Sequence, residues 1–173
     1  HAAARATRND AISVAAAAGA SALTGVVPTT SVGPKSVMFT AVDRAGNVAT
    51  RSCSYEVIYA FDGFYAPVDN PPVLNQVQAG RAIPVKFSLG GDQGLSILAA
   101  GSPGSQKITC DSAAPIDSVE ETVTAGGSSL SYSAGTARYT YVWKTNKDWG
   151  NTCRKLVLTL VDGTTHEARF KFK

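Results

Sequence analysis

Side chains that could support catalysis are scarce in this sequence. It contains two histidines, His1 and His166, and no G-x-S-x-G turn that would hold a serine nucleophile beside a base. Glu120 and Glu121 are adjacent carboxylates, but neighbours on an extended strand point to opposite faces and cannot act as a pair. The other acidic residues considered for such a pair are Asp69, Asp92 and Asp117. We therefore expect no catalytic residue and interpret His166 as an exposed strand residue.

Four aromatic residues could stack on sugar rings, which is the chemistry of a carbohydrate-binding site. Three of them, Tyr139, Tyr141 and Trp143, share one face of a predicted strand, where a β-sandwich core needs large apolar groups. Core packing is therefore the favoured interpretation for these three. Trp149 lies in the polar loop 147–151 and is the candidate for an exposed platform that binds a polysaccharide.

Oxygen-bearing side chains in predicted turns could bind calcium, as they often do in extracellular modules. The candidates are Asp43, Asn47, Asp69, Asn70 and Asp92. No Asp-x-Asp-x-Asp-Gly spacing occurs, and Asp and Asn side chains also hydrogen-bond the backbone of their own turns. We therefore expect neither a bound metal nor another cofactor, and calcium stays the alternative.

The cysteines Cys53, Cys110 and Cys153 permit one disulfide and leave one thiol over. None of them lies in a C-x-x-C spacing, which argues against a zinc site. Cys110 and Cys153 each lie on or beside a predicted strand, and we expect these two to be linked. A disulfide is typical of an exported protein, whereas two buried thiols are the alternative.

Composition and charge exclude several classes of protein. Hydrophobic residues make up 44% of the 173 residues and charged residues 17%, so the chain has enough apolar material to fold. A net charge of +3 is too small for a surface that neutralises the phosphates of nucleic acid. No apolar run reaches the roughly 18 residues that a membrane-spanning helix needs.

Apolar and polar residues alternate over four segments in the second half of the chain, which is the pattern of half-buried strands. The apolar positions are Val85, Phe87 and Leu89, then Tyr139, Tyr141 and Trp143, then Leu156, Leu158 and Leu160, then Ala168, Phe170 and Phe172. Asp162-Gly163, between the last two segments, predicts a hairpin with a two-residue turn in which both residues adopt positive φ. No segment of helical length keeps a helical period, so we expect an all-β protein.

The part before residue 58 is organised differently. Residues 1–25 are rich in alanine and could be an export signal cleaved near Ala20-Ser21-Ala22, although an initiator methionine and a leucine-rich segment are missing. Two extended runs from Ser36 to Val57 flank the turn Asp43-Arg44-Ala45-Gly46-Asn47, which predicts a hairpin. Residues 1–57 supply about three strands, whereas a sandwich needs roughly seven. We interpret them as the C-terminal part of a repeat.

A linked set of motifs runs from Tyr59 to Lys173. It consists of Phe61-Asp62-Gly63-Phe64, Pro67-Val68-Asp69-Asn70-Pro71-Pro72, Ala79-Gly80-Arg81-Ala82-Ile83, Pro84-Val85-Lys86-Phe87, Leu89-Gly90-Gly91-Asp92-Gln93-Gly94, Tyr139-Thr140-Tyr141-Val142-Trp143-Lys144 and Thr152-Cys153-Arg154. In this order the motifs resemble the PxKF domain, a family of secreted actinobacterial repeats named after the fourth motif. The resemblance implies a secreted or cell-surface accessory role, and it brings no catalytic residues.

Residues 32–57 are similar to the closing hairpin of bacterial immunoglobulin-like repeats, whose turn often reads Asp-x-x-Gly-Asn, here Asp43 to Asn47. Such repeats commonly precede a PxKF-like domain in large exported proteins. The similarity implies that Cys53 pairs with a residue of the same repeat that lies before this chain.

Lys86 lies between Val85 and Phe87 in the motif, so its side chain points to the opposite face of the strand. We expect a solvated cation there. A buried ion pair with Asp69 or Asp92 is the alternative.

These patterns predict an immunoglobulin-like antiparallel β-sandwich over residues 58–173, with a partial β repeat in front over residues 1–57. The predicted function is that of a non-catalytic extracellular structural or accessory module, a spacer, anchoring or adhesion domain of a larger exported bacterial protein. The alternatives are a carbohydrate-binding module attached to a secreted hydrolase and a hydrolase subunit with its catalytic domain upstream. The expected partners are neighbouring domains of the same polypeptide or, for the binding module, cell-wall or extracellular polysaccharide.

Overall fold

The computed structural model describes residues 4–7, 22–24, 27–124 and 130–173. The chain divides into two compact units, His1–Tyr59 and Ala60–Lys173, and each is described by itself. The regular elements of the described residues are strands, apart from the short 3-10 helix η2 (Lys147–Trp149). Nothing helical in this part of the chain is long and apolar enough to cross a bilayer. The predicted all-β class is confirmed.

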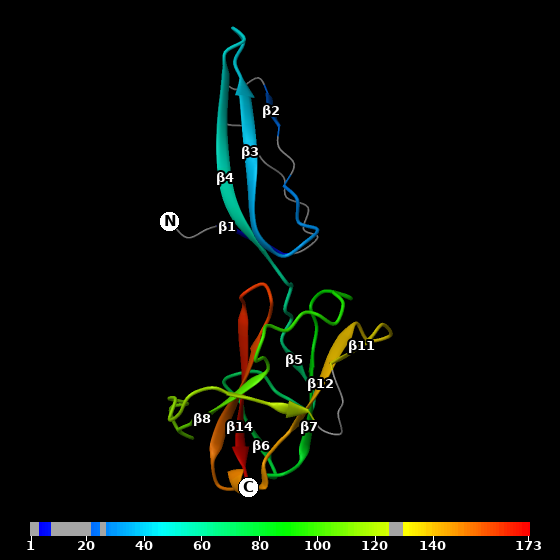
Figure 1. The fold of residues 1–173 in the computed structure, drawn as a ribbon, viewed down its shortest axis with the longest axis vertical. Coiled ribbons are helices and arrows are strands. Elements are labelled where there is room, and N and C mark those ends of the chain that lie inside the picture. Colours follow the sequence, from blue (N-terminus) through cyan, green and yellow to red (C-terminus); the bar gives the residue numbers. More distant parts are fainter. Residues whose placement is uncertain (1–3, 8–21, 25–26, 125–129) are drawn as a thin grey trace. The chain divides into compact units, whose positions relative to one another are not determined.

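The first unit contains a four-stranded sheet in the order β1-β4-β3-β2 (Figure 1). Its strands are β1 (Ala4–Thr7), β2 (Ala22–Thr24), β3 (Gly33–Val42) and β4 (Val48–Ile58). The predicted hairpin is confirmed as β3 and β4, and β1 adds a strand parallel to β4. The sheet therefore has one strand more than the sequence pattern predicted. The export-signal prediction for residues 1–25 falls mainly outside the described residues.

The β3–β4 turn is organised by the carboxylate of Asp43. This carboxylate accepts hydrogen bonds from the backbone N–H groups of Ala45 and Asn47, at 2.9 Å each, and from Asn47 Nδ2 at 2.7 Å. The hydrogen bond from the Asn47 side chain is the largest of the effects that lower the pKa of Asp43. Gly46 adopts a φ of 86°, which glycine accepts without steric cost. Asp43 and Asn47 thus stabilise their own turn.

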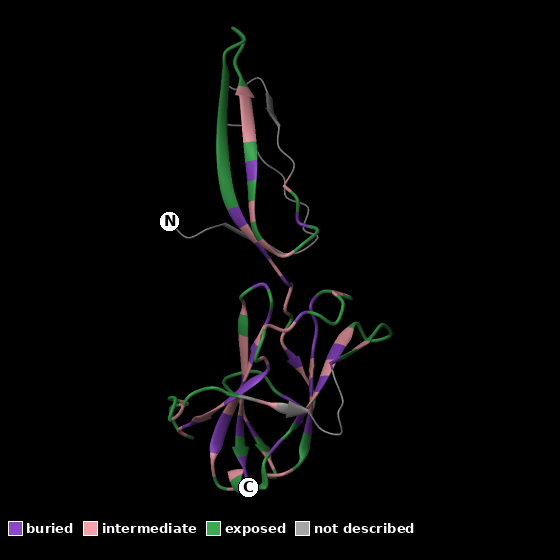
Figure 2. Ribbon diagram, in the orientation of Figure 1, coloured by how far each residue is buried: buried purple, intermediate pink, exposed green. Residues whose placement is uncertain are grey.

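The core that the described residues of the first unit form consists of Val37, Tyr55 and Val57, with Val27 and Phe39 packed against them. Residues 48–54 of β4 are exposed along their length (Figure 2).

The second unit is built from two five-stranded sheets (Figure 1). One has the order β10-β12-β7-β5, with β11 also paired to β12, and the other has the order β6-β14-β13-β8-β9. The strands of the first sheet are β5 (Phe64–Tyr65), β7 (Ala82–Phe87), β10 (Val123–Thr124), β11 (Ser131–Ser133) and β12 (Arg138–Lys144). Those of the second are β6 (Leu74–Val77), β8 (Gly104–Ile108), β9 (Glu120–Glu121), β13 (Cys153–Thr159) and β14 (Thr165–Phe172). Neighbouring strands run antiparallel, except that β6 lies parallel to β14.

The core lies where the inward rows of these two sheets meet. The predicted rows are buried, with Val85, Phe87, Tyr139 and Trp143 from one sheet and Leu156, Leu158, Ala168, Phe170 and Phe172 from the other each 0% exposed. The Trp143 ring meets the Phe170 ring edge to face, with 5.2 Å between the centroids. The two sheets therefore pack as an immunoglobulin-like β-sandwich, as the period-two pattern predicted.

The hairpin between β13 and β14 is confirmed, but its predicted turn is wrong. Leu160 N donates to Thr164 O at 2.9 Å and Gly163 N donates to Leu160 O at 3.0 Å, so the loop has three residues and not two. Gly163 adopts positive φ, at 82°, whereas Asp162 does not. The Asp162 carboxylate is buried and accepts hydrogen bonds from Thr164 N and Oγ1. With these hydrogen bonds Asp162 does not adopt the left-handed conformation that the predicted two-residue turn requires.

Candidate functional site

The disulfide between Cys110 and Cys153 is formed, as predicted. Cys153 begins β13 and lies opposite Ile108 at the end of β8. Cys110 follows two residues later, and the antiparallel pairing brings the two Cα atoms to 5.2 Å, within the usual range for a disulfide. Cys53 on β4 is an exposed free cysteine, and its pairing with a residue outside this chain stays a prediction.

His166 is packed as part of the fold. It lies on β14 and is half-buried, where the sequence pattern predicted exposure. Its ring stacks on Phe61, with 3.6 Å between centroids and 9° between planes, and Nε2 lies 3.2 Å from Thr164 Oγ1. Burial lowers the pKa of His166, against a smaller opposing effect of the Asp162 carboxylate. The lowered pKa favours the uncharged ring, which packs against Phe61.

Three of the acidic candidates for a catalytic pair, Glu120, Asp117 and Asp92, accept hydrogen bonds from the backbone or from an arginine. Glu120 Oε2 accepts a hydrogen bond from Arg154 Nη2 at 2.6 Å, and the Glu121 side chain lies outside the described part. Asp117 Oδ1 accepts from Lys107 N at 2.7 Å. The Asp92 carboxylate similarly accepts from Gly94 N.

The two calcium candidates of the loop 61–72, Asp69 and Asn70, take part in hydrogen bonds that hold the backbone. Asn70 Oδ1 accepts from Phe64 N at 2.7 Å, and Asn70 Nδ2 donates to Phe64 O at 2.9 Å. Asp69 is held through its main chain by Asn75. In the part of the chain that the structure describes, no three His, Cys, Asp or Glu side chains gather closely enough to hold a metal ion.

The Pro84-Val85-Lys86-Phe87 motif forms the second half of β7. Val85 and Phe87 are core residues, and Lys86 lies half-buried on the opposite face. Neither Asp69 nor Asp92, both of them described residues, forms an ion pair with Lys86. Strand β5 pairs with Lys86 and Phe87 of β7 and does not reach Pro84. The missing N–H of Pro84 therefore removes no hydrogen bond to β5. The motif is thus a structural element of the core.

Trp149 lies in η2, between β12 and β13, and is less exposed than predicted. It is half-buried, and its ring centroid lies 5.7 Å from that of Trp143 and 5.4 Å from that of Phe172. The guanidinium of Arg154 lies over the ring, 4.2 Å from its centroid. One face of Trp149 is therefore covered by a cation from β13, and only the remaining surface could meet a ligand.

Arg154 is a fixed support for Trp149. It is 4% exposed, its Nε donates to Ser105 Oγ at 2.9 Å, and its Nη2 forms the ion pair with Glu120. Thr152 adds a second support, because its Oγ1 donates to the carbonyl oxygen of Trp149 at 2.6 Å. The indole is thus held in one orientation.

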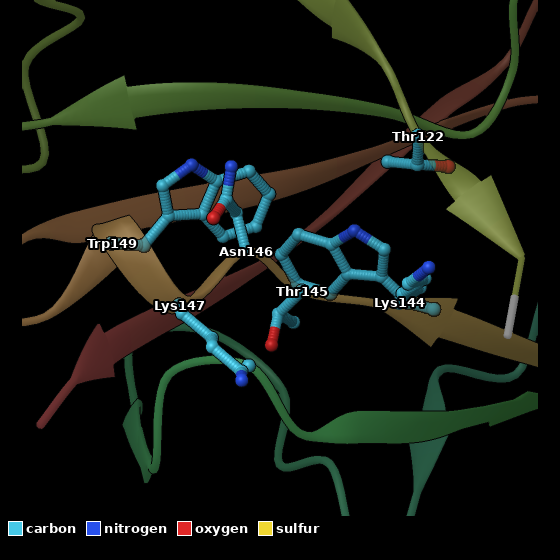
Figure 3. A pocket seen from close by; sticks show the side chains of 8 residues that line it. Thr122, Lys144, Thr145, Asn146, Lys147 and Trp149 are labelled. Atoms are coloured by element: carbon cyan, nitrogen blue, oxygen red, sulfur yellow. The ribbon is translucent and has the colours of Figure 1, made fainter.

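A pocket of about 420 Å³ lies beside Trp149 (Figure 3). Its lining consists of Gly80, Thr122, Trp143, Lys144, Thr145, Asn146, Lys147 and Trp149. The segment between β12 and η2 is anchored by Thr145, whose Oγ1 donates to Arg81 O at 2.6 Å. Asn146 caps η2 by accepting from Asp148 N at 3.0 Å. The pocket is therefore bounded by well-fixed backbone.

Trp143 contributes an unusual group to this pocket. Its side chain is 0% exposed, yet its Nε1 has no hydrogen-bond partner among the described residues. A buried N–H group without an acceptor costs about 1–3 kcal/mol. Because Trp143 borders the cavity but is covered in the unbound chain, its N–H becomes a donor to a bound molecule only when the neighbouring side chains shift.

The sequence pattern identified Trp149 but missed the rest of this pocket. Gly80, Thr122 and the segment 144–147 come from three places in the chain, and only the fold brings them together. The one local signal is Lys144-Thr145-Asn146-Lys147, a polar run that directly follows the buried Trp143.

Comparison with known proteins identifies no family for this chain. No family model and no curated protein matches it. One similar solved structure is Bacteroides ovatus SGBP-B, from a mixed-linkage glucan utilization locus, in complex with a mixed-linkage heptasaccharide. It is 10% identical over 84% of this chain, with a TM-score of 0.30, and this chain spans 31% of its length. Fibronectin(III)-like modules of Clostridium thermocellum CbhA are 14% identical, with a TM-score of 0.30, over 99% of this chain and 90% of that chain.

Proposed function

We propose that this chain is a non-catalytic accessory part of a larger exported bacterial protein, in which it serves as a spacer, anchoring or adhesion domain. The observation that carries this proposal is the lining of the pocket beside Trp149. It offers aromatic rings, hydroxyl groups, an amide and two exposed lysines, and none of its described residues is Asp, Glu, His, Ser or Cys. General acid–base and nucleophilic catalysis rely mostly on those groups, and a threonine or lysine nucleophile has to be activated by its surroundings.

Export is supported by the cross-link between Cys110 and Cys153. Disulfides persist in oxidising compartments and are rare in the reducing bacterial cytosol. We further propose that residues 59–173 are a PxKF domain and that residues 32–57 end an immunoglobulin-like repeat. In this proposal Cys53 pairs within the upstream repeat.

We expect the purified chain to leave dye-labelled polysaccharides, aryl glycosides and aryl esters unhydrolysed, because no described residue in the pocket lining is Asp, Glu, His, Ser or Cys. The measurement is product absorbance during a long incubation, compared with the same protein after heat inactivation. Turnover that purifies with the chain and disappears in the His166→Gln variant would show instead that the protein is an enzyme.

A second function, carbohydrate binding, is favoured by one specific observation. The pocket brings the rings of Trp143 and Trp149 to 5.7 Å from each other beside hydroxyl and amide groups. Aromatic surface combined with a few polar groups is typical of small-molecule sites. In this function the domain would attach its parent protein, such as a secreted hydrolase, to a cell-wall or extracellular polysaccharide.

A further inference from the structure

We propose that the pocket beside Trp149 binds a negatively charged sugar unit, a hexuronate within an acidic polysaccharide. This inference rests on the second proposed function, carbohydrate binding, and adds the ligand class and the groups that recognise it. The groups are the Trp143 N–H, the Trp149 ring and the ammonium groups of Lys144 and Lys147.

The first step concerns the unpartnered indole N–H of Trp143. It donates to no described residue, although Trp143 is 0% exposed, and Trp143 borders the pocket. An indole N–H is a donor only, so the molecule that satisfies it must present an oxygen or another acceptor. The hydroxyl and carboxylate oxygens of a sugar acid meet this requirement.

The second step concerns the surface on which a sugar ring would lie. The Arg154 guanidinium supports the Trp149 ring from one side, at 4.2 Å, and Arg154 is itself held by Ser105 and Glu120. The ring is therefore oriented before any ligand arrives, which reduces the entropy lost on binding. Trp149 also packs against Trp143 and Phe172, and the part of its ring that stays exposed borders the pocket (Figure 3) and offers apolar contact to the C–H groups of a pyranose ring.

The third step concerns charge. Lys144 and Lys147 line the pocket, both are exposed, and no described lining residue carries a carboxylate. Neither lysine forms an ion pair with a described residue. Asp148 lies in the same 3-10 helix but does not line the pocket. The described residues that line the pocket thus carry a net positive charge, which favours an anionic ligand over a neutral one.

The fourth step concerns how Lys147 is placed. A Cβ atom on Gly80 would lie 2.6 Å from Lys147 Cγ, and Gly80 adopts a φ of 79°. The lysine stem therefore lies against a position that only glycine can occupy without displacing it. Asn146 uses its Oδ1 on Asp148 N, which leaves its Nδ2 group available to a ligand oxygen.

The test is a titration of the full chain labelled with ¹⁵N, followed through the indole N–H signals. The probes are oligogalacturonate, a neutral gluco-oligosaccharide of the same length and inorganic phosphate. The Trp149→Phe variant keeps an aromatic ring and removes one indole signal, which identifies the signal of Trp143. We expect oligogalacturonate to shift the Trp143 signal and to bind about tenfold more tightly than the neutral sugar, given two ammonium contacts.

Matched variants test whether binding depends on the charges of the two pocket lysines and not on a change in folding. Lys144→Gln combined with Lys147→Gln is expected to weaken oligogalacturonate binding about tenfold and to reduce its salt dependence. Lys171→Gln, an exposed lysine on β14 that does not line the pocket, is expected to leave binding unchanged.

The outcomes test the acidic ligand separately from carbohydrate binding, the proposed function on which it rests. Equal binding of the neutral sugar would overturn the acidic ligand and leave carbohydrate binding standing. The same Trp143 shift with phosphate alone would overturn the sugar and indicate a simple anion site. No shift with either oligosaccharide would overturn both the inference and carbohydrate binding.

Discussion

Replacing Cys110 by serine is expected to lower the free energy of unfolding by about 4 kcal/mol, because the disulfide closes a long loop in the unfolded chain. The linked residues are 43 apart in sequence, and loop-closure entropy grows with that separation. Cys110 is exposed, so the substitution removes the cross-link without opening a cavity in the core. The measurement is urea denaturation of both proteins, followed by tryptophan fluorescence.

Cys53→Ser is the matched control for this experiment. Cys53 is exposed and free, so its replacement removes a thiol without removing a cross-link, and we expect a change within about 0.5 kcal/mol. A Cys110→Ser variant as stable as the Cys53→Ser variant would show that the cross-link contributes nothing to the fold.

Phe170→Ala is expected to cost about 3–5 kcal/mol, the range for removing a large ring from a well-packed core. Phe170 is 0% exposed, and its ring meets that of Trp143 from the opposite sheet. The loss should appear as a lower midpoint in thermal or urea unfolding. It should also change the fluorescence of the folded protein, because the Trp143 ring loses a neighbour.

Lys171→Ala is the control from the same strand. Lys171 is exposed and points to the opposite face of β14, so the expected change lies within about 0.5 kcal/mol. Equal losses for the two variants would contradict the assignment of this strand face to the core, and with it the two-sheet packing.

The strands and their inward faces could be predicted from sequence because their signal is local. Alternation along β12, β13 and β14 follows directly from the pleat of a strand, and the row Tyr139, Tyr141 and Trp143 is buried as that alternation predicts. The disulfide could be predicted as well, since the cysteines Cys110 and Cys153 are the two that lie near strands of the same domain.

The features that sequence could not predict depend on individual side-chain contacts, some of them between distant segments. Trp149 is half-buried, with Trp143 and Phe172 against its ring and the guanidinium of Arg154 over it, and the alternation of apolar and polar residues does not report such contacts. The turn at Asp162 differs from the expected type because its carboxylate binds Thr164. The pocket needs Gly80, Thr122 and Lys147 together, and their positions in the sequence give no sign that they meet.

The hydrogen-bonding roles of single turn residues also depend on the folded backbone. Asp43, Asn70 and Asp92 have the chemistry of calcium ligands, but in the structure they accept or donate hydrogen bonds within their own loops. The sequence predicted such turn hydrogen bonds and kept calcium as the alternative, which stays a prediction. The partner of each hydrogen bond depends on distances of about 3 Å, which only the folded backbone sets.

The central claim is that this chain is an exported accessory domain cross-linked by one disulfide. Mapping the cysteines of the native protein tests this claim most directly. The protein is recovered from the medium or the outer surface of its cells, alkylated without reduction, digested and analysed by mass spectrometry. We predict one peptide pair linked through Cys110 and Cys153, in the fraction from outside the cell. Alkylated, free thiols at both positions, or protein confined to the cytosol, would contradict the account.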